Sequence, residues 1–305
     1  MRTRPIGSLH ASVVGLGCNN FGRRVDAAGT KRVLDAAIEH GVTFLDTAEL
    51  YSTGESETFM GRALRGRRDQ VVLATKFGWR ADDGSGNARP ETIRPALEGS
   101  LRRLQVDHVD LYQLHRPDPA TPIADTLAAM GELVREGLVR EIGCSNFDAA
   151  QLAEADAAVA NGAPRFVSVQ NEYSLLHREP EEAVLPACQR LDLAFIPYFP
   201  LKSGLLSGKY RRGQPLPEGT RISANERLAD LVADESLARV ERLITFAEER
   251  GHSVLELAFA WLLARPTVAS VIAGATTPEQ VERNAAAAEW SLSEDDVAAL
   301  EPLLR

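Results

Sequence analysis

The feature of this 305-residue sequence that most constrains its fold is an alternation, repeated eight times, of short apolar segments with segments of helical hydrophobic spacing. Near-continuous apolar strands are typical of a parallel sheet that is buried on both faces, and eight strand–helix repeats favour a closed (β/α)8 TIM barrel. A doubly wound open sheet is the structural alternative. Because barrels of this kind take about 250 residues or more and no linker divides the chain, we expect one domain over residues 1–305. The expected strands are residues 12–17, 42–46, 71–76, 109–115, 141–145, 166–170, 193–198 and 268–274.

Helices are expected between these strands, and several have recognisable ends. Thr30 is the expected N-cap of the first helix, Asp148 caps a helix that runs to about residue 161, and Ser293 with Asp296 three residues later starts a closing helix. Residues 200 to about 233, rich in Gly and Pro, are expected to be irregular. The other expected helices are residues 30–40, 55–65, 91–104, 123–136, 179–191, 235–250, 254–264 and 278–288.

Composition and charge exclude several classes of function. The net charge is −9, and no basic stripe of the kind that binds nucleic acid is present. The sequence lacks a signal-peptide core and any run of 18 apolar residues, so we expect a cytoplasmic protein that does not enter a membrane. Three widely spaced cysteines, Cys18, Cys144 and Cys188, fit a reducing compartment. No spacing of His, Cys, Asp or Glu suggests a metal site.

In a barrel, function lies where the strands end and the following loops begin. The polar residues at those positions include Asp46, Lys76 and His115, and Tyr51 follows just after the second strand. Each residue alone has an ordinary structural explanation, as a cap, a solvated side chain or a half-buried ring. Four ionisable or phenolic groups that converge on one barrel mouth instead indicate a catalytic site.

The segments around these residues resemble the aldo-keto reductase family. FLDTAELY at 44–51 has an Asp followed five residues later by a Tyr, ATK at 74–76 resembles the lysine strand, and LHRP at 114–117 the histidine motif. GCSNF at 143–147 resembles the motif that binds the nicotinamide amide, and residues 198–209 and 272–284 resemble the two cofactor segments. The motifs occur in the family's order over nearly the whole chain. Residues 2–11 resemble the β-hairpin that closes the barrel bottom in this family.

The resemblance implies hydride transfer between NADP(H) and a small carbonyl or alcohol substrate, with reduction of aldehydes and ketones to alcohols. Reduction builds negative charge on the carbonyl oxygen, so a proton donor must meet that oxygen. Tyr51 is the expected acid–base residue, Lys76 the neighbour that lowers its pKa, Asp46 the partner that holds Lys76 charged, and His115 the residue that orients the substrate.

The cofactor residues follow from the same resemblance. Many family members grip the adenosine 2′-phosphate with a Lys-Ser pair and an Arg, whereas this chain has Gly274-Ala275 and Gln280. NADP(H) is the preferred cofactor and NAD(H) is possible; Thr276, Thr277 and Arg283 are candidate substitutes for the missing cations. The expected cofactor-binding residues are Ser145, Asn146, Gln170, Tyr198, Leu201, Ser203, Leu205, Gly274, Thr276, Gln280 and Asn284.

Two rival functions remain at this point. Lys76 could form a Schiff base, as in an aldolase barrel, or the chain could be a regulatory or binding subunit, as are potassium-channel β subunits of similar fold. A glycine pattern at 15–22 does not match a dinucleotide fingerprint, and residues 204–209 fall one residue short of a phosphate loop. We expect a rather open substrate pocket with Phe21, Trp79 and Tyr173 as apolar walls. The loops expected to set the substrate are residues 19–24, 78–89, 172–178 and 209–230 and the turn after His115. The natural substrate and the oligomeric state are not specified by these motifs.

Overall fold

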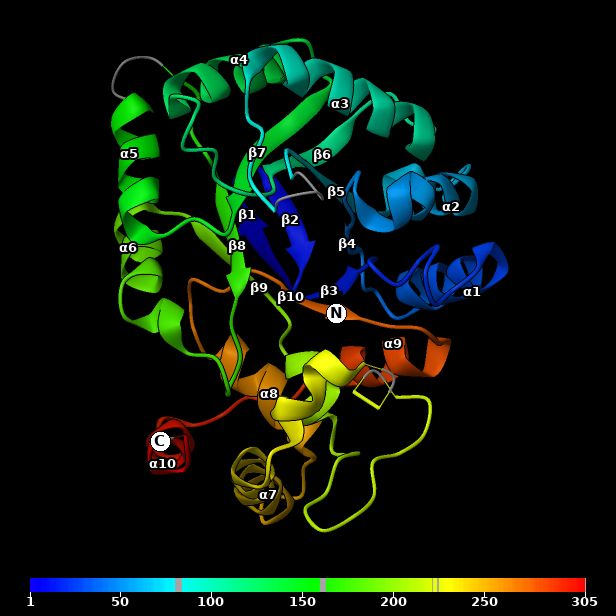
Figure 1. The fold of residues 1–305 in the computed structure, drawn as a ribbon, viewed down its shortest axis with the longest axis vertical. Coiled ribbons are helices and arrows are strands. Elements are labelled where there is room, and N and C mark those ends of the chain that lie inside the picture. Colours follow the sequence, from blue (N-terminus) through cyan, green and yellow to red (C-terminus); the bar gives the residue numbers. More distant parts are fainter. Residues whose placement is uncertain (80–83, 160–162, 221, 224, 305) are drawn as a thin grey trace.

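The computed structural model describes residues 1–79, 84–159, 163–220, 222–223 and 225–304. Within this part of the chain, eight strands close into a barrel in the order β10-β3-β4-β5-β6-β7-β8-β9 (Figure 1). In the described part of the chain, neighbouring barrel strands pair in parallel, and β10 closes the ring beside β3. The open-sheet alternative is therefore excluded. The barrel strands are β3 (Val14–Gly17), β4 (Phe44–Asp46), β5 (Val72–Phe77), β6 (Val109–Leu114), β7 (Val139–Ser145), β8 (Ser168–Glu172), β9 (Ala194–Tyr198) and β10 (Val271–Gly274).

The expected N-terminal hairpin is present and closes the end of the barrel where the strands begin. Its strands β1 (Thr3–Ile6) and β2 (Leu9–Ser12) are antiparallel and lie across the middle of the ring in Figure 1. Ile6, at 0% exposure, packs with Phe44 and other side chains of the barrel interior. The Ser12 hydroxyl accepts hydrogen bonds from the backbone N–H groups of Thr43 and Phe44, so the hairpin is joined to the start of β4.

Helices surround the barrel, and the apolar face of each packs inward. Apart from Glu256, α8 is largely apolar and buried, and α7 packs against it. The described helices are α1 (Ala27–Glu39), α2 (Glu55–Ala63), α3 (Pro90–Leu104), α4 (Ile123–Arg135), α5 (Ala149–Val159), α6 (Val184–Leu191), α7 (Asp234–Glu248), α8 (Val254–Leu263), α9 (Pro278–Ala286) and α10 (Glu294–Leu300).

Several expected boundaries are wrong for local reasons. The first helix starts after Asp26, whose carboxylate accepts from the N–H of Gly29, and Thr30 is a buried residue inside the helix rather than its cap. The expected helix over 179–191 is divided into a 3-10 turn at Glu179–Glu181 and α6. The strand expected at 166–170 begins two residues later, at Ser168.

Other expected ends are confirmed by their hydrogen bonds. Asp148 accepts from the N–H of Gln151 at the start of α5, and Ser293 with Asp296 forms a reciprocal capping box at the start of α10. The expected end of α5 near residue 161 lies outside the described residues. Among the described helices, none combines the length and the apolar character needed to cross a membrane.

Candidate active site

Asp46, Lys76, Tyr51 and His115 meet at the rim of the barrel where the strands end. Asp46 is the last residue of β4, Lys76 lies near the end of β5, and His115 directly follows β6. Because these strands run parallel and in register, their ends lie at one edge of the barrel. Tyr51 opens a 3-10 turn, Tyr51–Gly54, just beyond β4. The Lys76 ammonium lies 2.6 Å from Asp46 Oδ2 and 3.3 Å from the Tyr51 hydroxyl oxygen.

Asp46 is the centre of a buried hydrogen-bond network. Besides the Lys76 ammonium, the amide nitrogens of Gln113 and Gln170 donate to Asp46 Oδ1 at 3.2 and 2.9 Å. Lys76 is 0% and Asp46 2% exposed. Sequence reasoning missed Gln113; its place two residues before His115, on the same face of the strand, is the signal that could have found it. The two amides hold the carboxylate in one orientation, and the carboxylate in turn holds Lys76.

Burial and the neighbouring charges together set the pKa values of Lys76 and Tyr51. Burial opposes the Lys76 charge, but the neighbouring Asp46 carboxylate and the Tyr51 hydroxyl outweigh it, and the pKa of Lys76 is raised. Burial raises the pKa of Tyr51, and although Lys76 acts in the opposite direction, the net pKa lies above the ordinary value of 10.0. Lys76 thus acts on the pKa of Tyr51 in the expected direction, but desolvation is the larger effect and the net pKa is raised. The phenol is held protonated at neutral pH.

His115 is held neutral at the same rim. Burial, followed by the nearby charges of Lys76 and Arg116, lowers its pKa well below 6.5. Its ring lies edge-on to Tyr51, with centroids 5.9 Å apart, and edge-on to Trp79 at 4.7 Å. The buried Nδ1 atom has no hydrogen-bond partner among the described residues. A neutral imidazole in this position can offer one N–H to a ligand oxygen.

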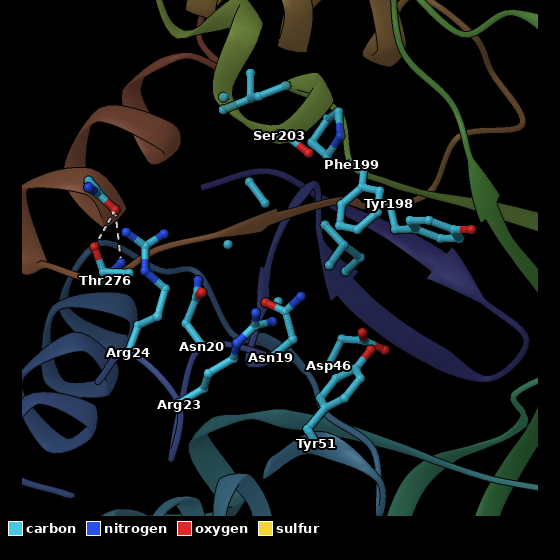
Figure 2. A pocket seen from close by; sticks show the side chains of 18 of the residues that line it. Asn19, Asn20, Arg23, Arg24, Asp46, Tyr51, Tyr198, Phe199, Ser203 and Thr276 are labelled. Carbon is cyan, nitrogen blue, oxygen red and sulfur yellow. Dashed lines mark hydrogen bonds between the residues drawn. The ribbon is translucent and has the colours of Figure 1, made fainter. Parts of the chain in front are cut away.

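A cavity of about 990 Å³ runs from this rim across the end of the barrel. Figure 2 shows its extent, with Tyr51 and Asp46 at one end, Tyr198, Phe199 and Ser203 along one side, and Thr276 at the other end. The volume suits a ligand larger than a simple carbonyl compound. Of the expected cofactor-binding residues, those that line this cavity are Ser145, Asn146, Gln170, Tyr198, Leu201, Ser203, Gly274, Thr276, Gln280 and Asn284.

The middle of the cavity wall is organised around Asn146. Asn146 has a positive φ of 63°, and its amide nitrogen donates to the carbonyl oxygen of His115 at 3.0 Å and to the hydroxyl of Ser145 at 3.1 Å. The Tyr198 hydroxyl donates to Asn146 Oδ1 at 2.8 Å. Burial raises the pKa of Tyr198 to about 12, so this hydroxyl remains a donor. The polar wall and the catalytic rim are thus joined through His115.

The far end of the cavity has the form of an anion site. Thr277 caps α9, and the N–H and hydroxyl of Thr276 both donate to the side-chain oxygen of Gln280, at 2.8 and 3.2 Å. Figure 2 shows the Arg24 side chain beside Thr276. Arg24 and Arg283 both line the cavity. Two guanidinium groups beside the start of a helix are suited to bind a phosphate.

The charge of the cavity is opposite to that of the protein. Although the net charge of the chain is −9, five of the described lining residues are cationic and only Asp46 and Glu55 are carboxylates. Of the five, only Arg283 was identified from the sequence; Arg24 could have been found as a cation on a loop at the end of the first barrel strand. The five cationic lining residues are Arg23, Arg24, Arg116, Lys209 and Arg283.

Three expected ligand contacts are not in the cavity wall. Leu205 is 1% exposed and belongs to the hydrophobic core. Phe21 is also fully buried in this core. Tyr173 packs against Trp261, donates its hydroxyl to Glu181 at 2.6 Å, and is likewise buried. Of the expected apolar walls only Trp79 lines the cavity; residues 80–83 of its loop lie outside the described residues. From the sequence alone, an aromatic side chain in the core cannot be told from one that lines the cavity, because hydrophobicity predicts burial in both places.

Comparison with known proteins identifies the family. The model of the aldo/keto reductase family matches residues 13–305, and the chain belongs to this family.

Three relatives illustrate the range of similarity. Aldo-keto reductase YhdN of Bacillus subtilis is 35% identical over 94% of this chain and 88% of its own length. A probable voltage-gated potassium channel subunit beta of rice is 36% identical over 87% of this chain and 83% of its own. The crystal structure of an aldo-keto reductase from Klebsiella pneumoniae in complex with NADPH has a TM-score of 0.77 at 33% identity, with 97% of this chain and 92% of that chain covered. Proteins named as reductases and a protein named as a potassium channel subunit are thus about equally identical in sequence to this chain.

The buried pair makes a prediction about stability. Replacing Asp46 by Leu leaves the Lys76 ammonium without a carboxylate in an apolar site, so the free energy of unfolding in urea should fall by about 3–5 kcal/mol. The double variant Asp46→Leu/Lys76→Met should recover part of this loss, because no unpaired charge remains. If the double variant instead loses the sum of the unfolding free energies that the two single variants lose, the two groups do not depend on each other.

Proposed function

We propose that this chain is an NADP(H)-dependent oxidoreductase that reduces aldehydes or ketones to alcohols, with Tyr51 as the proton donor. The observation that carries the proposal is the chain of contacts from Asp46 through Lys76 to the Tyr51 hydroxyl, at 2.6 and 3.3 Å, at one end of a long basic cavity. A protonated phenol beside a fixed cation is suited to give a proton to an oxygen that gains negative charge.

The chain's own residues fit an NADP(H) molecule. The excess of cationic lining residues matches a ligand with several phosphate charges, and Arg24, Arg283 and the start of α9 together would hold the 2′-phosphate. The similar Klebsiella enzyme is known in complex with NADPH. Ser145, Asn146 and Gln170 would hold the nicotinamide amide, Tyr198 would stack on the ring, Leu201 and Ser203 would follow the pyrophosphate, and Gly274, Thr276, Gln280 and Asn284 would surround the adenosine.

The catalytic roles follow from the geometry. The bound nicotinamide supplies the hydride. Tyr51 then donates its proton to the substrate oxygen, and the Lys76 ammonium stabilises the phenolate that remains. Asp46 keeps Lys76 charged and in place, and it is held by Gln113 and Gln170. The neutral imidazole of His115 donates an N–H to the substrate oxygen and orients it.

The same geometry bears on the two rival functions. A Schiff-base lysine must be deprotonated to attack a carbonyl, whereas the Asp46 carboxylate raises the pKa of Lys76. A purely regulatory role would need none of the contacts that join Asp46, Lys76 and Tyr51. The three cysteines carry free thiols, in keeping with the reducing cytoplasmic compartment that we also propose.

Removing the proton donor tests the proposed reaction. Tyr51→Phe should lower kcat for reduction of 4-nitrobenzaldehyde with NADPH by about 10²- to 10⁴-fold, because the ring remains and only the hydroxyl is lost. NADPH affinity, followed by quenching of tryptophan fluorescence, should stay within about threefold. Wild-type protein that binds NADPH but reduces no aldehyde would refute the proposed reaction.

The pH dependence tests the protonation states. Because the pKa of Tyr51 lies above 10.0 and that of His115 well below 6.5, kcat/KM for reduction of a neutral aldehyde should be level between about pH 7 and 9. It should fall only as the pH rises past 10, where the proton donor is lost. A fall that is centred below pH 9 would show that Lys76 outweighs burial once cofactor is bound.

The cationic end of the cavity tests the cofactor preference. Arg24→Gln and Arg283→Gln should each raise KM for NADPH by about 3- to 30-fold and leave KM for NADH nearly unchanged, because NADH lacks the 2′-phosphate. Arg32→Gln, an exposed arginine on α1 outside the cavity, is the matched control. Equal effects on both cofactors would place these cations against the pyrophosphate instead.

A further inference from the structure

Arg116 places a guanidinium group at the catalytic end of the cavity. It directly follows His115 at the end of β6, and it lines the cavity together with Trp79 and Tyr51. Its Cζ atom lies 4.7 Å from the centroid of the Trp79 ring, and that ring lies 4.7 Å from the ring of His115. The group is therefore close to where a substrate carbonyl would react.

Arg116 has no anionic partner among the described residues. Its Nε is buried and without a hydrogen-bond partner, and no ion pair is formed by its guanidinium within the described ranges. By contrast, Arg68, Arg103 and Arg178 each contact a carboxylate. Although Nε is closed off, Arg116 as a whole is only partly buried and lines the cavity, so a ligand in the cavity can approach its guanidinium.

The stacking on Trp79 leaves the donors of Arg116 available. A guanidinium that lies over an aromatic ring uses its face, whereas its N–H groups point outward in its own plane. Two of these N–H groups form a fork that matches the two oxygens of a carboxylate. The nearby charge of Arg116 also contributes to the lowered pKa of His115, so the charge acts at the catalytic rim.

The cofactor does not account for this group. In the proposed function, the phosphates lie along Leu201 and Ser203 and at Thr276, whereas Arg116 lies beside His115. Asp46 is engaged by Lys76, Gln113 and Gln170. Two other charged residues line the cavity at the Tyr51 end: Arg23 is a cation and Glu55 is a carboxylate, so their charges offset each other. Since no described residue forms an ion pair with Arg116 and the cofactor phosphates are placed elsewhere, the substrate is the group that we expect to supply an anion to it.

We infer that Arg116 binds a carboxylate group on the substrate, and that the enzyme prefers aldehydes or ketones that carry a carboxylate a few bonds from the carbonyl. This inference rests on the proposed function, since it names the class of substrate for the same site. The carboxylate would take a bidentate contact from Arg116 while the carbonyl oxygen meets Tyr51 and His115.

The test compares two substrates that differ in one charge. 4-Carboxybenzaldehyde and its methyl ester, methyl 4-formylbenzoate, have the same reacting carbonyl and nearly the same shape; 3-carboxybenzaldehyde and its ester vary the distance. The quantity measured is kcat/KM for the acid divided by kcat/KM for the ester, with NADPH, so any loss common to both substrates cancels. In the wild type this ratio should be about 10 or more for at least one isomer, mainly through a lower KM.

Variants of Arg116 and Arg23 show which arginine causes the preference for the acid over the ester. Arg116→Gln should lower the ratio by about 10- to 100-fold, and Arg116→Lys should give an intermediate value, because the charge remains and the fork is lost. Benzoate should compete with the ester in the wild type and should bind at least about tenfold more weakly in Arg116→Gln, whereas neutral benzamide should not distinguish the two. Arg23→Gln is the matched comparison on the same cavity.

The outcomes separate this inference from the proposed function. A wild-type ratio near 1 for both isomers, a ratio unchanged in Arg116→Gln, or a fall confined to Arg23→Gln would overturn the role of Arg116. Reduction of the neutral ester that is lost in Tyr51→Phe would uphold the proposed function in each of those cases. If Arg116→Gln does not fold, the ratio and the benzoate competition in Arg116→Lys decide the matter.

Discussion

The arrangement of this site depends on the buried contact between Asp46 and Lys76. A lysine at 0% exposure stays charged only with a carboxylate beside it, and this carboxylate is held in turn by two glutamine amides from β6 and β8. The barrel makes this possible, because parallel strands in register bring residues that are far apart in sequence to one rim. The ammonium then lies against a phenol that burial keeps protonated. The Asp46–Lys76 contact thus keeps a positive charge beside the phenol, while burial keeps the phenol protonated.

The cavity adds a second constraint, because the charge of its lining is opposite in sign to the net charge of the protein. A protein with a net charge of −9 repels anionic ligands at long range, yet five cationic residues line this cavity. Two of them, Arg24 and Arg283, lie at the end away from Tyr51, and Arg116 lies beside the catalytic residues. This division gives the cavity two cationic ends with a polar wall of amides and hydroxyls between them. A long phosphorylated cofactor and an anionic substrate could share such a cavity without competing for the same cations.

The barrel and the meeting of Asp46, Lys76, Tyr51 and His115 at one rim could be predicted from the sequence, because hydrophobic period and strand-end position are local properties of the chain, whereas the closing hairpin was expected only from the family resemblance. Helix ends were less predictable: Asp26 and Thr30 are both good caps, and only the packing of α1 decides between them. The contact between Gln113 and Asp46 could not be read from either residue alone, since it depends on strand register. Phe21 and Tyr173 were misplaced for a related reason, because an aromatic side chain on a loop can face the core or the pocket. The net pKa of Tyr51 also needed the structure, since it reflects burial as well as the nearby charge.

The most direct test of the central claim is the turnover of Lys76→Met, which keeps an unbranched side chain but removes the ammonium and its hydrogen bonds to Asp46, Thr47 and Tyr51. The protein is first shown to be folded by circular dichroism, and its NADPH affinity and its kcat for 4-nitrobenzaldehyde are then measured together. If the ammonium stabilises the phenolate left after proton transfer, kcat should fall by about 100-fold or more, while the dissociation constant for NADPH stays within about threefold. A folded Lys76→Met variant that reduces the aldehyde at nearly the wild-type rate would contradict the account.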